Sequence, residues 1–174
     1  MTRPLIIAID PDTRGWIVIG DRLGVTHAGP LAEWLDAVPH WTAPTGSVAF
    51  VEAIPYIPGK GQIATRVQGE IRGRAIQAVA SGGCRVVEVK AQAWQRAIGV
   101  ALPSGRKAPL SLSPAQRRKL LKSRIMGFCR ARSMDLATAD GTFPLSLHSA
   151  DAFAIWWYAR ADLRFREHAA RRAT

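Results

Sequence analysis

Two carboxylates follow short apolar runs in the N-terminal third of the chain. Residues 5–9 lead into Asp10, and residues 47–51 lead into Glu52. Each run is typical of a buried strand with one carboxylate at its end. Because an unpaired buried charge is unfavourable, such a carboxylate needs a metal ion or a hydrogen-bond network as its partner. For Asp10 taken alone, the alternative is a carboxylate that caps the turn at residues 10–13.

A histidine and an aspartate near the C-terminus complete a possible ligand set. His148 and Asp151 are three residues apart in the stretch LHSADAFAIWWYA, so both side chains are expected on one face at the first turn of a helix. Carboxylates and imidazole are ligands that Mg²⁺ or Mn²⁺ accepts. The residues therefore predict a metal site of Asp10, Glu52, His148 and Asp151. Taken alone, His148 is more often a histidine near a helix cap.

The alternation of apolar runs and turns predicts an α/β fold with a mixed five-stranded sheet. Three consecutive antiparallel strands precede two strands parallel to the first, at residues 5–9, 15–20, 22–29, 47–52 and 84–89. The second and third strands would meet across a short turn at Gly20 and Asp21. Flanking helices are predicted at residues 31–38, 62–81, 91–98, 114–133 and 147–166. Asp10 and Glu52 then end parallel strands at one edge of the sheet.

Two of these helices have a recognisable buried side. The helix at 114–133 has Ser113 as its N-cap and Pro114 in its first turn, and its apolar residues are Leu121, Ile125 and Phe128. The last helix has the apolar stripe Ala150, Phe153, Ala154, Trp157 and Ala161. Residues 164–174 form an arginine-rich tail that is expected to be frayed. A single domain over residues 1–174 accounts for the whole pattern.

The helix at 62–81 contains two glycines four residues apart. Its predicted core stripe is Ile63, Val67, Ile71, Ala75 and Ala78. Gly69 and Gly73 each cost about 1 kcal/mol relative to alanine in a helix interior, so the pair suggests close approach of another backbone. Two alternatives stay open on spacing alone. The glycines face a second helix, such as that of a symmetry mate, or they pack against the sheet of this chain.

The charge balance favours a polyanionic partner. The chain has 24 Lys and Arg against 13 Asp and Glu, a formal net charge of +11. Residues 89–134 contain no acidic residue and eleven basic ones. A merely soluble surface has interspersed acids, so this stretch is interpreted as a track for a phosphate backbone. The segments at 54–61 and 100–112 are expected to touch the substrate.

Other features exclude several classes of protein. Cys84 and Cys129 lie far apart in apolar surroundings, as expected of two buried thiols in a reducing compartment. No apolar run approaches the roughly 18 residues of a membrane span, and no signal or transit peptide is apparent. The sequence predicts a soluble cytoplasmic protein without a membrane partner or small-molecule cofactor.

Several motifs together resemble the RuvC-type Holliday junction resolvases of the RNase H-like superfamily. They are AIDPDTRG, VEAIP, VQGEIRGRAIQAVAS, LLKSRI and HSADAFAI, which occur in the order of that family over nearly the whole chain. The VEAIPY and QAWQR segments and the histidine at 148 look closest to the plant chloroplast branch and to phage relatives. The resemblance implies an RNase H-like fold.

The resemblance also implies roles for individual residues. Asp10, Glu52, His148 and Asp151 would form the catalytic metal site, with two Mg²⁺ ions that Mn²⁺ may replace, and Lys122 would match a basic residue near the scissile phosphate. Trp94 falls where bacterial members carry another basic residue, with Arg96 nearby. Asp12 stands where many members have glycine. A homodimer interface is expected through a set on the helix at 62–81: Gly69, Arg72, Gly73 and Ile76.

The expected activity is resolution of four-way DNA junctions by two-metal-ion hydrolysis, with paired symmetric nicks made by a homodimer. Alternatives are an RNase H-like nuclease acting on RNA–DNA hybrids or flaps, and a non-catalytic junction-binding protein. The residues expected to contact DNA are Lys60, Arg66, Arg96, Arg106, Lys107, Arg117, Arg118, Lys119, Lys122 and Arg124.

Overall fold

Five strands form one mixed sheet in the computed structural model, which describes residues 3–37, 41–54, 62–103, 112–132 and 145–173. The strand order is β3-β2-β1-β4-β5, with β2 antiparallel to β1 and β3, and with β4 parallel to β1 and β5. The strands are β1 (Ile6–Asp10), β2 (Trp16–Gly20), β3 (Val25–Pro30), β4 (Val48–Ala53) and β5 (Arg85–Lys90). The predicted sheet of three antiparallel and two parallel strands is confirmed.

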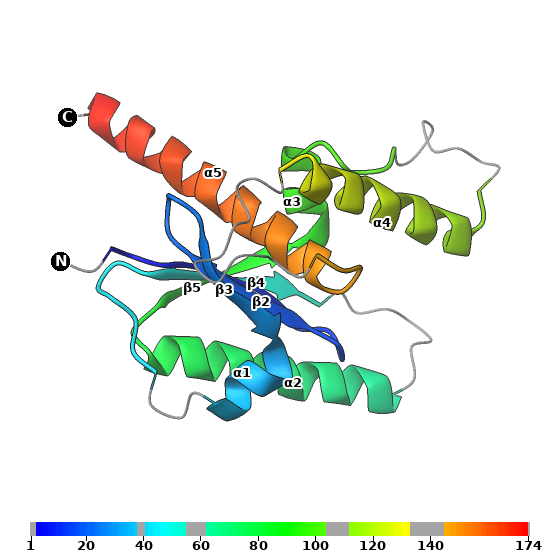
Figure 1. Cartoon of the computed structure of the whole chain (residues 1–174), viewed down its shortest axis with the longest axis horizontal. Helices are drawn as coiled ribbons and strands as arrows, with labels where there is room; N and C mark the ends of the chain where they lie inside the picture. The colour runs from blue at the N-terminus through cyan, green and yellow to red at the C-terminus, as the bar shows by residue number, and fades with distance from the viewer. Residues whose placement is uncertain (1–2, 38–40, 55–61, 104–111, 133–144, 174) are drawn as a thin grey trace.

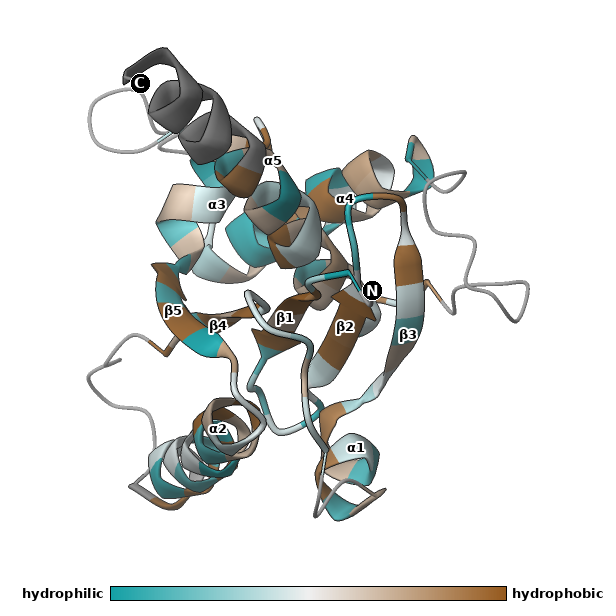
Figure 2. Cartoon of the chain, turned by 90° about the vertical axis from the view of Figure 1, so that its left-hand side faces the viewer, coloured by the Kyte–Doolittle hydropathy of each residue, from teal (hydrophilic) through white to brown (hydrophobic). Residues whose placement is uncertain are grey.

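Helices cover both faces of the sheet (Figures 1 and 2). On one face lie α1 (Leu31–Ala37) and α2 (Gln62–Ser81). On the other lie α3 (Ala91–Ala97), α4 (Pro114–Arg130) and α5 (Ser149–Ala173). Because side chains alternate along a strand, β1 supplies both cores: Ile6 and Ala8 pack toward α5, and Ile7 and Ile9 pack toward α1 and α2. This explains why the β1 sequence is a continuous apolar run.

The N-cap of α4 was predicted correctly from the sequence, whereas the turn between β2 and β3 was not. Ser113 caps α4 as predicted, and it forms a capping box with Gln116. The predicted short turn between β2 and β3 was wrong, since β3 begins only at Val25. The Asp21 carboxylate accepts hydrogen bonds from the backbone N–H groups of Leu23 (2.6 Å) and Gly24 (3.2 Å), which stabilises a longer turn.

Helix α5 differs from the prediction at both ends. It begins at Ser149 rather than residue 147, and it continues to Ala173, beyond the predicted end at residue 166. The tail expected to be frayed is therefore helical up to Ala173. Residues 152–156 are all fully buried, because this part of α5 lies between the sheet and helices α3 and α4. Ala161, predicted to be buried, is exposed.

Helix α2 has the predicted bounds, but its predicted core stripe was wrong in the first half. Ile63 is 82% exposed and Val67 is 37% exposed, because the first turns of α2 reach beyond the strand ends (Figure 1). Gly69 and Gly73 face away from the sheet, and a Cβ added at either one would meet nothing within 4 Å. Packing of these glycines against the sheet of the same chain is therefore excluded.

Two further expectations can be compared with the described residues. Cys84 and Cys129 are buried free thiols, as predicted. None of the helices in the described part of the chain is both long and apolar enough to cross a membrane.

Candidate active site

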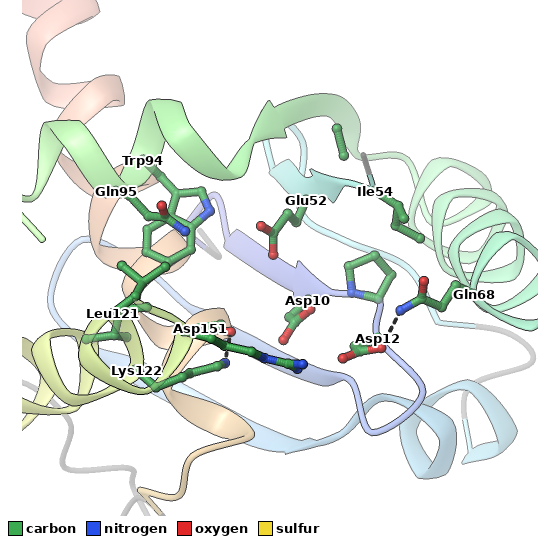
Figure 3. A pocket seen from close by; sticks show the side chains of 14 residues that line it. Asp10, Asp12, Glu52, Ile54, Gln68, Trp94, Gln95, Leu121, Lys122 and Asp151 are labelled. Atoms are coloured by element: carbon green, nitrogen blue, oxygen red, sulfur yellow. Dashed lines mark hydrogen bonds and ion pairs between the residues drawn. The ribbon is translucent and has the colours of Figure 1, made fainter. Parts of the chain in front are cut away.

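Three carboxylates from different elements line one cavity of about 320 Å³ (Figure 3). Asp10 ends β1, Glu52 lies near the end of the adjacent parallel strand β4, and Asp151 lies in the first turn of α5. The parallel register, in which Ile9 pairs with Val51, brings the first two to the same edge of the sheet. The predicted convergence of Asp10 and Glu52 is confirmed, and α5 adds Asp151 to them.

Burial and mutual repulsion raise the pKa values of two of these groups. The pKa of Asp10 lies well above its ordinary value because of burial, and the charges of Glu52, Asp151 and Asp12 raise it further. Burial also raises the pKa of Glu52 to about 7, with the Asp151 charge as the next cause. The cavity therefore has a deficit of positive charge.

Lys122 of α4 supplies part of that charge. Its Nζ forms an ion pair with Asp151 Oδ2 and lies 3.5 Å from the Leu147 carbonyl oxygen. The ammonium group lowers the pKa values of both Asp10 and Glu52. The other carboxylate oxygen, Asp151 Oδ1, is buried without a hydrogen-bond partner, so one acceptor in the cavity remains unsatisfied.

An apolar wall closes one side of the cavity. It consists of Trp94, which is 1% exposed, with Leu121 and Ile125 from α4. The Trp94 indole N–H is buried beside Glu52 and slightly lowers its pKa, although its geometry falls short of a full hydrogen bond. Such a wall excludes water and strengthens electrostatic interactions among the groups inside.

The donor set fits a hard divalent cation in its chemistry. Carboxylate oxygens that repel one another, one of them without a partner, would be satisfied by such an ion. As the side chains lie here, no three His, Cys, Asp or Glu residues among those described are arranged to hold a metal ion. Asp151 Oδ1 is the oxygen that remains open to an ion, because Oδ2 pairs with Lys122.

His148 lies beside this cavity and not in its wall. It precedes α5, so the prediction that it shares the first helical turn with Asp151 was wrong. Its exposed side chain lines a neighbouring depression of about 350 Å³, whose other walls include Arg14, Arg118 and Asp12. Asp10 and Lys122 line both hollows, so His148 remains next to the carboxylates. Its role as a metal ligand stays a prediction.

The predicted basic residues fall into three groups. Arg118 and Lys122 line the carboxylate cavity. Others lie outside its wall on α2, α3 and α4, where Arg66 pairs with Glu70 (2.8 Å) and Arg124 donates to the Ala101 carbonyl oxygen (3.1 Å); the remainder of this group is Arg96, Arg117 and Lys119. Lys60, Arg106 and Lys107 lie outside the described residues, as do most of the two segments expected to touch the substrate.

The residues predicted to form a dimer interface lie on two sides of α2. Gly69 and Gly73 are open to solvent. Arg72 forms an ion pair with Glu88 of β5, and Ile76 packs partly against the core beneath the sheet. The open glycines thus remain available to a second helix, whereas the other two residues already have contacts within the chain.

Sequence reasoning missed one cavity residue and left another without a role. Gln68 of α2 is 6% exposed and lines the cavity, where its side-chain amide donates to Asp12 Oδ1 (Figure 3). The position of Gln68 on the inner face of a helix could have indicated a buried hydrogen-bonding role, because buried polar groups need partners. Asp12 is that partner.

The same architecture occurs in solved structures of a DNA-processing protein. A structure of Thermus thermophilus RuvC in complex with a Holliday junction substrate covers 94% of this chain and 96% of its own, with a TM-score of 0.55 and 12% sequence identity. A second Thermus thermophilus RuvC structure covers 91% of this chain and 96% of its own, with a TM-score of 0.50 and 14% identity. This chain has the RuvC fold. No family model and no curated protein matches it.

The likeness to RuvC confirms the fold that the motifs predicted. At 12% and 14% identity it concerns the fold alone. The suggested closeness to the chloroplast and phage branches of RuvC-type proteins receives no support from these comparisons and stays a prediction.

Proposed function

We propose that this protein is a structure-selective endonuclease that cleaves four-way DNA junctions by metal-dependent phosphodiester hydrolysis. The observation that carries the proposal is the convergence of Asp10, Glu52 and Asp151 on one cavity within a RuvC fold. A solved RuvC with the same fold is complexed with a Holliday junction substrate. The net charge of +11 on this chain suits such a polyanion.

The carboxylates would hold two Mg²⁺ ions, which Mn²⁺ may replace. Asp10, Glu52 and Asp151 would hold these ions, which would offset the repulsion by which Glu52 and Asp151 raise the pKa of Asp10. His148 would bind an ion or position the attacking water from the adjacent depression. Bound cations would supply Lewis-acid activation of water and stabilise the leaving 3′ oxygen.

Basic residues of α4 would receive the scissile strand. Arg118 and Lys122 line the cavity and could contact the phosphate group directly. Lys122 would exchange its contact with Asp151 for one with the phosphate, where it would offset developing negative charge. Arg117, Lys119 and Arg124 on the same helix, together with Arg96 at the end of α3, would extend the contact along the backbone.

A homodimer would place two such cavities on one junction. Gly69 and Gly73 expose helix backbone on α2, and none of the described residues covers them. A second copy of α2 packed there would explain why two destabilising glycines occur in one helix. Two fixed active sites are what paired symmetric incision requires.

Cleavage of synthetic substrates tests the proposal. The protein is incubated with a four-way junction, a linear duplex, a flap and an RNA–DNA hybrid, each with Mg²⁺, Mn²⁺ or a chelator. We expect paired nicks in the junction with either ion and none with chelator or with Asp10→Asn. Preferential cleavage of the hybrid or flap would overturn junction resolution in favour of another nuclease activity. Tight junction binding without cleavage under any condition would indicate a binding protein.

A further inference from the structure

A partly buried hydrogen bond connects the turn after β1 to helix α2. The Gln68 side-chain amide donates to Asp12 Oδ1, and the same oxygen accepts the backbone N–H of Thr13 at 2.8 Å. Gln68 is 6% exposed, so loss of this bond would remove a hydrogen bond from a buried side chain. Figure 3 shows this pair at one end of the carboxylate cavity, with Asp10 beside Asp12.

The backbone of the turn connects the position of Asp12 to that of Asp10. The backbone N–H of Gly15 donates to the Asp12 carbonyl oxygen at 2.8 Å. A Cβ at position 15 would lie 2.2 Å from the Asp10 carbonyl oxygen and 2.8 Å from that of Asp12, so only glycine fits. The backbone carbonyls of Asp10 and Asp12 therefore both pack on Gly15, so the turn is closely packed.

We propose that Asp12 and Gln68 are positioning residues for the reaction proposed above, because their hydrogen bond fixes the turn that carries Asp10. The inference rests on the proposed function for its effect on cleavage. The rival interpretation is that Asp12 is another ligand of the metal ions. The structure favours positioning, since Asp12 Oδ1 already accepts two N–H groups, and both donors can also bond the neutral amide oxygen of an asparagine.

That difference provides the test. Asp12→Asn keeps an oxygen acceptor for Gln68 and Thr13 but removes the charge, whereas Asp12→Ala removes both. We expect Asp12→Ala and Gln68→Leu each to lower the single-turnover cleavage rate of a four-way junction by about 10- to 100-fold, the size of effect that a small misplacement of a reacting group produces. Asp12→Asn should retain most of the rate. Junction affinity and far-UV circular dichroism should stay at wild-type values.

The combined variant and a matched control complete the cleavage experiment. Asp12→Ala with Gln68→Leu should be no slower than the worse single variant, since both changes break the same bond. Gln77→Leu, an exposed glutamine on the same helix, should leave the rate unchanged. An Asp12→Asn variant as slow as Asp12→Ala, or additive effects in the double variant, would overturn the positioning role.

Hydrogen exchange separates this inference from the proposed function. Exchange of the Gly15 and Thr13 amides, measured by NMR, should be protected in the wild-type protein and at least tenfold faster in Gln68→Leu. Unchanged exchange of these amides in Gln68→Leu would show that the Gln68–Asp12 hydrogen bond does not fix the turn, whatever the cleavage result. If exchange is faster in Gln68→Leu but the wild-type protein does not cleave junctions, the hydrogen bond does fix the turn. The proposed function is then rejected.

Discussion

Lys122 of α4 pairs with Asp151 of α5, and this contact puts an ammonium group at the edge of a cavity that is also lined by Asp10, Asp12 and Glu52. The pair joins residues 29 positions apart in sequence. Ile125 and Phe128 of α4 belong to the same buried apolar cluster as Phe153 of α5. The two helices that carry the ion pair are therefore packed together. Several predictions about charge in the cavity depend on this arrangement.

Replacement of Lys122 by Gln should strengthen metal binding while it slows cleavage. The substitution removes a cation that competes for Asp151, so the Mn²⁺ affinity measured by calorimetry should rise by about fivefold, which corresponds to an ion pair of about 1 kcal/mol. Cleavage should fall because no ammonium group reaches the phosphate. Lys119→Gln is the control for metal affinity, since Lys119 is exposed and does not line the cavity. Unaltered Mn²⁺ affinity would show that Lys122 does not compete with metal.

Asp10→Asn should abolish cleavage and leave junction binding intact or improved. The change removes one charge from the group most affected by its carboxylate neighbours, so repulsion of the phosphate backbone falls while the central ligand is lost. Gel-shift assays and cleavage assays on the same junction measure the two effects. Near wild-type cleavage would remove Asp10 from the proposed metal site.

The metal-free protein should lose stability as the pH rises from about 4.5 to above 7. Glu52 has an ordinary pKa of 4.5 and a pKa of about 7 in the fold. The native state therefore binds more protons than the unfolded state in this window, and ∂ΔG/∂pH of unfolding is negative. The stabilising contribution is complete below pH 4.5 and is lost through pH 7.

Thermal denaturation in chelator at several pH values measures this dependence. Glu52→Gln cannot titrate at this position, so its melting temperature should depend less on pH over the same window. Added Mg²⁺ should restore stability at pH 8 more than at pH 5, since only the ionised carboxylates bind it. Equal pH dependence of the variant and the wild type would mean that Glu52 does not titrate in this range.

Junction affinity should depend steeply on salt, and α4 should account for part of the slope. Each lost phosphate contact reduces the slope of log K against log salt by about one unit. Arg118→Ala with Lys119→Ala should thus reduce it by about two. Arg85→Ala, an exposed arginine at the start of β5, is the control and should not change the slope. No change in the double variant would mean that α4 faces away from the DNA.

Gly73→Leu should convert a dimer into monomers without loss of the fold. A Cβ added at Gly73 meets nothing within 4 Å among the described residues, so the fold has room for a side chain there, whereas a partner helix packed on this face would not. Sedimentation should show halved mass with unchanged far-UV circular dichroism, and paired incision should be lost. Gly127→Leu is a matched control, because Gly127 is an equally open glycine on α4. A Gly73→Leu protein that stays dimeric would place the interface elsewhere.

The sequence by itself predicted the strand directions and three of the carboxylates that line the cavity, namely Asp10, Glu52 and Asp151. Asp10 and Glu52 end apolar runs typical of buried strands, and parallel strands place their ends at one edge. The bounds of α2 and the N-cap of α4 could also be predicted, because the signals for them, turn residues and helical spacing, act within a few positions in the sequence. The motifs also led to the RuvC fold.

Only the tertiary structure decided which groups meet across those elements. Exposure of Ile63 depends on where α2 passes the end of the sheet, which no helical periodicity encodes. The contacts of Asp12 with Gln68 and of Lys122 with Asp151 join residues 56 and 29 positions apart. Such pairings arise because burial forces each polar group to find a partner in its own surroundings, and those surroundings exist only once the helices have packed on the sheet.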